Sequence, residues 1–264
     1  AFMRRYYLGI LFGLICAVLL FTCKEKEAES PFRNIADTQA EYVGMDQCKS
    51  CHMPIYNTYM QTGMGQSWGL ATKQKRSADF SNAHPPVYDT ALNLYYKAFW
   101  KGEDMYIKEY RITNGDTSHY REEKISYVVG SGQHTNSHIT DNNGYLHQAP
   151  ITFYTQKGQW DLAPGFEDGQ NSRFSRKIEA ECITCHNGYP QHTEGSLNKY
   201  ANVKTGIDCE RCHGPGSIHV SEKLSGKLVD TSKGPDYSIV NPRRLNTDQQ
   251  SNLGQRCHLQ GIAV

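Results

Sequence analysis

The sequence predicts an α+β fold with low regular structure, in which short helices and loops surround a core that side chains fill only in part. Three observations support this prediction. Only 38% of the 264 residues are hydrophobic and the mean hydropathy is -0.65, which is low for a globular domain. Runs rich in Tyr, Ile, Val and Thr lie between residues 87 and 160, where there is no cysteine. The paired cysteines lie on either side, so we expect a β-rich insertion between the first and second cysteine pairs.

The beginning of the chain has the pattern of a secretory signal peptide, residues 1–22. Arg4 and Arg5 precede an apolar run over residues 8–21, which is too short to span a membrane comfortably. Cys23 follows where a bacterial lipoprotein signal carries its lipidated cysteine, with an ordinary cleaved signal or an uncleaved anchor as alternatives. We therefore expect an exported periplasmic or outer-membrane lipoprotein, attached to the membrane through a lipid anchor.

The charge of the chain excludes one class of partner. The sequence has 28 Lys and Arg against 27 Asp and Glu, which gives a net charge of +1, and it contains no basic run. Recognition of nucleic acid requires Lys and Arg gathered on one face. Nucleic acid is therefore not expected as a partner.

Four segments follow the signal peptide. Residues 23–40 are polar with alternating charge, which predicts a flexible tether. Residues 41–80 form the first cysteine-containing segment, with a helix predicted from Asp46 to about Tyr59. Residues 81–168 form the β-rich insertion, for which the alternation of strand and turn signals predicts about five to seven strands. Residues 169–264 are expected to be helical or irregular and contain the remaining cysteine motifs.

Three pentapeptides share the pattern Cys-x-x-Cys-His. Two thiols three residues apart lie on one helical turn and can form thioethers to both vinyl groups of a haem, and the adjacent His then faces the iron. Zinc sites and disulfides also use CxxC pairs, but neither needs a His after every pair. The pattern therefore predicts three c-type haems. They would be attached through Cys48, Cys51, Cys182, Cys185, Cys209 and Cys212, with His52, His186 and His213 as proximal iron ligands.

A fourth motif near the end of the sequence is incomplete. Gly254 occupies the position of the first cysteine, and Cys257 and His258 follow in the expected frame. One thiol can still form one thioether. Three interpretations stay open: a fourth haem with a single thioether, a sequence change at position 254 in a true site, or a free Cys-His pair.

The remaining histidines supply candidate distal ligands. A second His makes an iron low-spin with a low potential, whereas an open position permits substrate binding. His219 follows His213 by six residues, a tight fit for the same iron, so a neighbouring haem is its expected target. His134 and His138 are four residues apart after a flexible Gly-Ser-Gly, and at least one is expected to be a ligand, with a surface strand as the alternative.

A series of short sequences occurs in a characteristic order from about Tyr42 to the end. They are YVGMDQCKSCH with TGMGQS, YVVGSGQH, NGYLHQAPITFY with WDLAPGF, CITCHNGYP, IDCERCHGPGSIHV, IVNP and QRCHLQG. In this order they resemble bacterial multihaem c-type cytochromes with a cytochrome c554-like domain, a family often fused to downstream tetratricopeptide repeats. The resemblance implies that His219 is a distal haem ligand and that Gly254 stands where relatives carry a cysteine. It also implies that the chain is truncated before such repeats.

These observations predict an electron carrier. It would transfer electrons in the periplasm or at the outer membrane through its haems, with redox proteins as partners and no catalytic residues. From Cys182 to Cys209 is 27 residues (209 − 182), few enough for the second and third haems to be neighbours. The alternative is a multihaem reductase that acts on a small nitrogen or sulfur substrate at one open-faced haem. A haem-based sensor or assembly module is a third interpretation.

Overall fold

The computed structural model describes residues 30–75, 78–81 and 83–258. The predicted signal peptide, residues 1–22, and the predicted lipidation site, Cys23, lie outside these residues. Within the described ranges, none of the helices combines the length and the apolar character that a membrane span requires.

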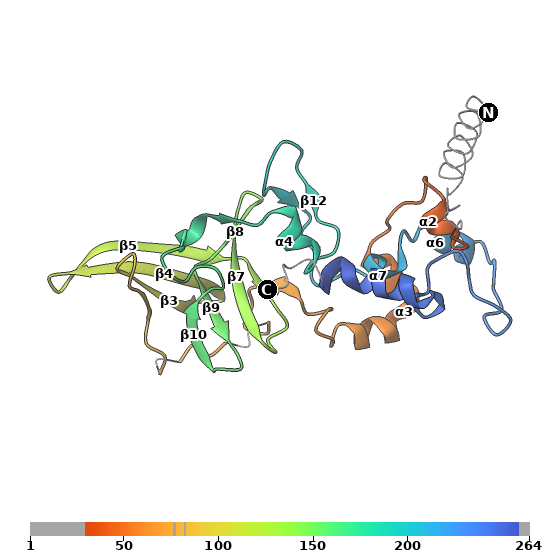
Figure 1. Cartoon of the computed structure of the whole chain (residues 1–264). Helices are drawn as coiled ribbons and strands as arrows, with labels where there is room; N and C mark the ends of the chain where they lie inside the picture. Colours follow the sequence, from red (N-terminus) through yellow and green to blue (C-terminus); the bar gives the residue numbers. More distant parts are fainter. Residues whose placement is uncertain (1–29, 76–77, 82, 259–264) are drawn as a thin grey trace, which may run out of the picture.

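The described residues form 13 strands and six α-helices. The strands are β1 (Trp68–Leu70), β2 (Val87–Asp89), β3 (Leu94–Lys101), β4 (Asp104–Thr113), β5 (Asp116–Ile125), β6 (Tyr127–Val129), β7 (Thr135–Asn142), β8 (Tyr145–Gln148), β9 (Ile151–Tyr154), β10 (Gln159–Leu162), β11 (Arg176–Lys177), β12 (Gln191–His192) and β13 (Tyr200–Ala201). The helices are α2 (Arg33–Ala36), α3 (Met45–Tyr59), α4 (Ala180–Thr184), α5 (Glu210–His213), α6 (Ser217–Leu224) and α7 (Thr247–His258). Figure 1 shows β3, β4 and β5 at one end of the molecule and α2, α3, α6 and α7 at the other.

The strands pair into three antiparallel sheets. The four-stranded sheet has the order β2-β3-β4-β5. The seven-stranded sheet has the order β1-β6-β7-β8-β11, with β9 paired to β7 and β10 paired to β9, and β12 and β13 form a two-stranded sheet. Consecutive strands are therefore mostly neighbours, as expected where short hairpin turns connect them.

Two Asn-Gly turns explain how the long hairpins close. Asn114 and Gly115, between β4 and β5, have φ angles of 52° and 90°. Asn143 and Gly144, between β7 and β8, have φ angles of 54° and 87°. Positive φ at both central positions is the geometry whose twist matches that of the flanking strands, and Asn followed by Gly adopts it at the lowest cost.

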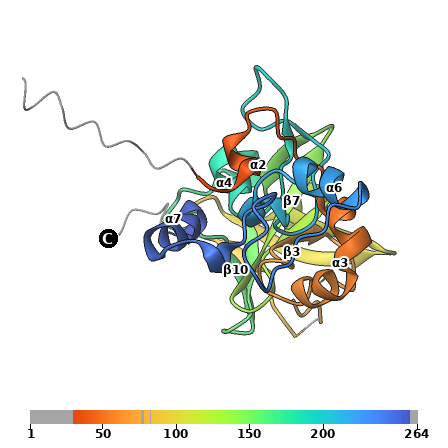
Figure 2. The same ribbon diagram turned by 90° about the vertical axis from the view of Figure 1, so that its right-hand side faces the viewer.

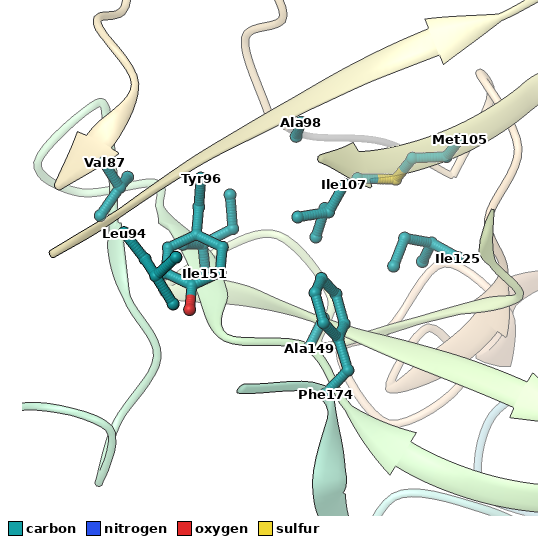
Figure 3. Close-up of a cluster of buried hydrophobic side chains, with 10 residues drawn as sticks. All are labelled: Val87, Leu94, Tyr96, Ala98, Met105, Ile107, Ile125, Ala149, Ile151 and Phe174. Atoms are coloured by element: carbon teal, nitrogen blue, oxygen red, sulfur yellow. The ribbon is translucent and has the colours of Figure 1, made fainter. Parts of the chain in front are cut away.

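The first hydrophobic core lies on the inner face of the four-stranded sheet. Figure 3 shows side chains from β3 and β4 directed toward Ala149, Ile151 and Phe174 on the opposite side. Tyr96 and Ile107 are fully buried there, with exposed fractions of 0%. Burying a large apolar side chain of this kind contributes about 1.5–3 kcal/mol, so this sheet holds itself together through protein contacts.

The second hydrophobic core joins the seven-stranded sheet to α4. Its buried members are Trp68, Ile139, Leu146, Ile178, Ile183 and Tyr200. Ile183 lies between the two cysteines of the second CxxCH motif. The β-rich part of the molecule therefore fixes the second motif in a core made of side chains.

Among the residues that the structure describes, the helical end has no comparable core. Helices α3, α6 and α7 contain no buried residue, and both core clusters consist of residues outside them. Apolar side chains on these helices are exposed, with 44% for Met53, 66% for Ile55 and 75% for Leu224. Figure 2 shows α2, α3 and α6 in front of the strands. Because a helix in a protein gains most of its stability from packing an apolar face, these helices lack their expected packing partner.

The predicted fold class is wrong. The sequence predicts an α+β fold with low regular structure around c-type haems, whereas the described residues are β-rich, with three sheets and only short helices. The strands between residues 87 and 162 number nine, more than the five to seven expected, and β11, β12 and β13 extend into the segment expected to be helical or irregular. Sheet faces that are exposed to water contribute to the low apolar content, which therefore does not indicate a lack of regular structure.

Candidate haem-binding site

The first motif lies on α3, and the local sequence bends this helix at the proximal histidine. Cys48, Cys51 and His52 occupy the first two turns, and His52 has non-helical angles of φ -111° and ψ 35°. Pro54 follows two residues later and disfavours the helical conformation just before it. The bend leaves the thiol of Cys51 and the ring of His52 exposed to solvent.

The third motif orients its histidine through a backbone carbonyl. Nδ1 of His213 lies 2.8 Å from the carbonyl oxygen of Val240. A carbonyl can only accept, so Nδ1 carries the proton and donates it, and Nε2 keeps its lone pair. Metal-binding histidines commonly have their second nitrogen held in this way.

His219, on α6, is oriented through two successive hydrogen bonds. Its Nδ1 lies 2.9 Å from Oγ of Ser238, which donates its only proton to Oδ1 of Asp236 at 2.6 Å. Because that hydroxyl proton is already used, Nδ1 of His219 must be the donor, and its Nε2 is left with the lone pair. Burial opposes ionisation of Asp236, but hydrogen bonds from Lys223 and Ser238 outweigh it and lower the pKa of Asp236 to about 2.

The structure brings His52 and His219 together. Their ring centroids are 6.3 Å apart and the ring planes differ by 20°. Two imidazoles that bind one metal ion from opposite sides at about 2 Å per nitrogen have ring centres about 6 Å apart. The distance between His52 and His219 is therefore compatible with one iron between them, and it places His219 beside the first motif.

The second motif is fixed to both the β-rich part and the third motif. Oγ of Ser67 lies 2.6 Å from the carbonyl oxygen of His186. Nη2 of Arg211, inside the third motif, donates to the carbonyl of Thr184, inside the second, at 2.8 Å. This contact agrees with the neighbouring second and third sites that their spacing in the sequence predicts.

The thiols of different motifs lie close enough to affect each other. None of the seven described cysteines forms a disulfide bond. The hydrogen bond between Cys48 and Cys209 raises the pKa of Cys48 and lowers that of Cys209. Burial raises the pKa of Cys185 and of Cys212, and the nearby thiol of Cys257 raises both further. The third motif thus lies between the first motif and the incomplete fourth.

The remaining predicted ligands lie on α7 and in the β-rich part. His258 is exposed at the end of α7, and Gly254 is exposed on the same helix. His134 is exposed just before β7, with its Nδ1 2.8 Å from Nε2 of Gln156. His138 is buried in the β-rich part, stacked on Trp160 at 5.2 Å. For His134, Cys257 and His258, a role in haem binding stays a prediction.

The predicted tether is partly anchored to the site. Residues 30–40 include α2, and Asn34 is fully buried there. Its Nδ2 donates to the carbonyls of His213 and Pro215 at 2.9 and 3.0 Å. At the start of α2, Nη2 of Arg33 donates to Oε2 of Glu222 on α6 at 2.9 Å. Sequence reasoning missed these roles because polar composition alone does not show which residues are buried.

Two buried acids in and next to the third motif were also not predicted from the sequence. Glu210, between the motif cysteines, is 1% exposed, and Asp208 is 6% exposed. Oδ2 of Asp208 accepts from the backbone N–H of Met45 at 3.1 Å. Glu210 accepts from backbone groups before α3 and α6. The sequence does show a carboxylate inside a CxxCH motif, which could have indicated a role for Glu210. No sequence pattern indicates that Ser238 and Asp236 orient His219.

The residues present fit a covalently bound haem. The described motif thiols are not in disulfides, and two histidines hold Nε2 ready to bind a metal. Among the described residues, the helices that carry the first and third motifs contribute to neither hydrophobic cluster. In addition, the buried Trp68 Nε1 and Tyr200 hydroxyl, which belong to the core that contains Ile183, have no hydrogen-bond partner among the described residues. Such donors suit an acceptor such as a haem carboxylate.

Comparison with known proteins agrees with this chemistry for part of the chain. A family model described as cytochrome c554 and c-prime matches residues 157–214, which include the complete second and third motifs. The match supports a cytochrome c554-like domain, with covalently bound haem c and a role in electron transfer. Searches of curated proteins and of solved structures find no match.

Proposed function

We propose that the protein is a multihaem c-type cytochrome that carries electrons through three haems, attached at Cys48–His52, Cys182–His186 and Cys209–His213. It would act in the periplasm or at the outer membrane, anchored by a lipid on Cys23, with redox proteins as partners. When bound, the haems supply the reversible one-electron chemistry of iron. The chain supplies their attachment, their axial ligands and their relative positions.

The pair formed by His52 and His219 carries this proposal. Imidazoles on both faces of an iron leave no position for a substrate and favour a low-spin centre with a low potential. The 6.3 Å separation of these rings therefore supports an electron carrier rather than a reductase. Asp236, through Ser238, would increase the electron donation of His219 and stabilise the oxidised iron.

The third motif supports transfer between sites, because it contacts both of the others. Arg211 bonds to the second motif, and the acids Asp208 and Glu210 bond to the segment that begins α3. These hydrogen bonds between side chains and backbone groups would hold the three attachment sites in a fixed arrangement. A fixed arrangement keeps the distance between redox centres constant, and the transfer rate depends on that distance.

The test is a haem count followed by a spin-state measurement on protein matured in a bacterial periplasm. A pyridine haemochrome assay with intact mass gives the number of covalent haems, and low-temperature EPR gives their spin states. We expect three haems, all low-spin, or four if Cys257 and His258 hold another. His219→Ala should keep the haem count and convert one haem to high-spin, whereas His192→Ala, at an exposed histidine on β12, should change neither.

Three other results would each contradict part of the proposed function. An open high-spin haem in the unmodified protein would contradict the carrier and favour the reductase. The absence of covalent haem would reject both. A normal low-spin spectrum in His219→Ala would show that His219 is not a distal ligand.

A further inference from the structure

Glu210 holds a buried carboxylate at the centre of the site. It lies between Cys209 and Arg211 in the third motif and is 1% exposed. Oε1 accepts from the backbone N–H of Val43 at 2.9 Å and of Gly216 at 2.8 Å, and Oε2 accepts from the N–H of Gly44 at 2.7 Å. A buried carboxylate needs such donors, and here the backbone supplies all three.

The three donors lie at the beginnings of two helices. Val43 and Gly44 immediately precede α3, and Gly216 immediately precedes α6. The first N–H groups of a helix have no partner within it and carry a partial positive charge. One carboxylate therefore satisfies donors of both helices and holds their N-terminal ends against each other.

The backbone around this carboxylate is shaped by glycine. A Cβ atom at Gly216 would lie 3.0 Å from Oε1 of Glu210 and 2.8 Å from a methyl group of Val43. Gly44 has a φ angle of 85°, which other residues rarely adopt. The close approach of both segments to Glu210 therefore depends on glycine at each helix start.

The two helices held by Glu210 are the ones that carry the paired histidines. His52 lies eight residues after Gly44, about 12 Å along α3, and His219 lies three residues after Gly216, about 4.5 Å along α6. We propose that Glu210 is a positioning residue that sets the distance and orientation between His52 and His219. This inference rests on the proposed function and adds to it the group that fixes one pair of axial ligands.

The experiment compares matured, haem-containing variants. Glu210→Gln keeps the shape and one acceptor oxygen but turns an amide N–H toward a backbone N–H, and Glu210→Ala removes all three bonds. The control is Glu122→Gln, on β5, whose carboxylate bonds to the side chains of Tyr120 and Lys101 instead of to backbone. The readouts are haem count, low-temperature EPR, binding of carbon monoxide to the reduced protein, and the reduction potentials.

We expect all variants to keep the haem count of the unmodified protein. In Glu210→Ala one haem should become partly high-spin and bind carbon monoxide, as in His219→Ala, and in Glu210→Gln the EPR signal and potential of the same haem should shift. Glu122→Gln should match the unmodified protein. If Glu210→Ala does not accumulate, Glu210→Gln decides the question.

Unchanged EPR signals, carbon monoxide binding and potentials in Glu210→Gln and Glu210→Ala would overturn the role of Glu210 and leave the proposed function intact. If the unmodified protein itself lacks a low-spin haem that depends on His219, the proposed function fails before any Glu210 variant is compared. The two failures are therefore distinguishable.

Discussion

The two ends of this molecule are stabilised by different means. The β-rich end buries its own side chains in two clusters, which also hold the second motif through Ile183. The helical end, with the first and third motifs, is held by hydrogen bonds of buried polar groups such as Asn34 and Glu210. The difference teaches that one end is a folded scaffold in its own right, whereas the other is shaped to be completed by a bound group.

The largest expected effect follows from removing that group. If all six cysteines of the complete motifs are replaced by alanine, the β-rich end should stay folded and the helical end should not. Hydrogen exchange measured by mass spectrometry should then show amides of β3, β4 and β7 protected roughly 100-fold or more above those of α3 and α6. The matured protein, protected at both ends, is the control, and equal protection at both ends without haem would contradict the comparison.

The next effect concerns the β-rich core. Ile107→Ala should cost about 2–5 kcal/mol of stability, since Ile107 is fully buried and its removal leaves a cavity. Chemical denaturation followed by tryptophan fluorescence measures the loss, while the haem spectrum should stay unchanged. Ile112→Ala, at a position on the same strand that is 43% exposed, is the matched control. A haem spectrum that changes in Ile107→Ala would show that the two ends are not independent.

A pH effect is expected from one buried histidine of the β-rich end. Burial lowers the pKa of His138 from 6.5 to about 4. Between these values the unfolded chain binds a proton that the folded chain does not, so stability falls by up to about 3 kcal/mol as pH drops through this window. Denaturation midpoints between pH 7 and pH 4 measure this loss. In His138→Phe the loss of stability between pH 7 and pH 4 should be smaller by that amount, whereas His192→Phe should lose as much as the unmodified protein. An equal pH dependence in all three proteins would contradict the role of His138.

The smallest expected effect lies at the helical end. Asn34→Ala removes two hydrogen bonds to the carbonyls of His213 and Pro215 and should cost about 1–3 kcal/mol in the matured protein. Hydrogen exchange should rise in α2 and α6 and stay constant in β3 and β4. Gln39→Ala, at an exposed position of the same segment, should change neither. Faster exchange in the β-strands of Asn34→Ala would count against independent ends.

The parts of the fold that are encoded locally could be predicted. The helix expected from Asp46 to Tyr59 is α3, and runs such as NLYYKAFW and DMYIKEYRI are strands. Asn-Gly at residues 114–115 forms the turn that this dipeptide favours. The fold class could not be predicted, because the low apolar content has two causes that composition does not separate: exposed sheet faces and a bound group.

The candidate site also has a part that the sequence predicts and a part that it does not. The spacing within each CxxCH motif indicates haem attachment without any knowledge of the fold. The partners that orient the histidines come from distant segments: Val240 bonds to His213, 27 residues earlier, and Val43 bonds to Glu210 across 167 residues. Nothing in the sequence near those residues shows such contacts, because they exist only once the chain has folded.

The bond between Val43 and Glu210 has a consequence for biosynthesis. At about 5–20 residues per second, the ribosome takes roughly 10–30 s to add the 167 residues that separate these two. For that interval Glu210 has not yet been added, and His219 follows it, so the contacts of the first motif with both residues cannot form. The order of the chain therefore places the thiols of Cys48 and Cys51 ahead of every residue of the third motif that holds the first one in position.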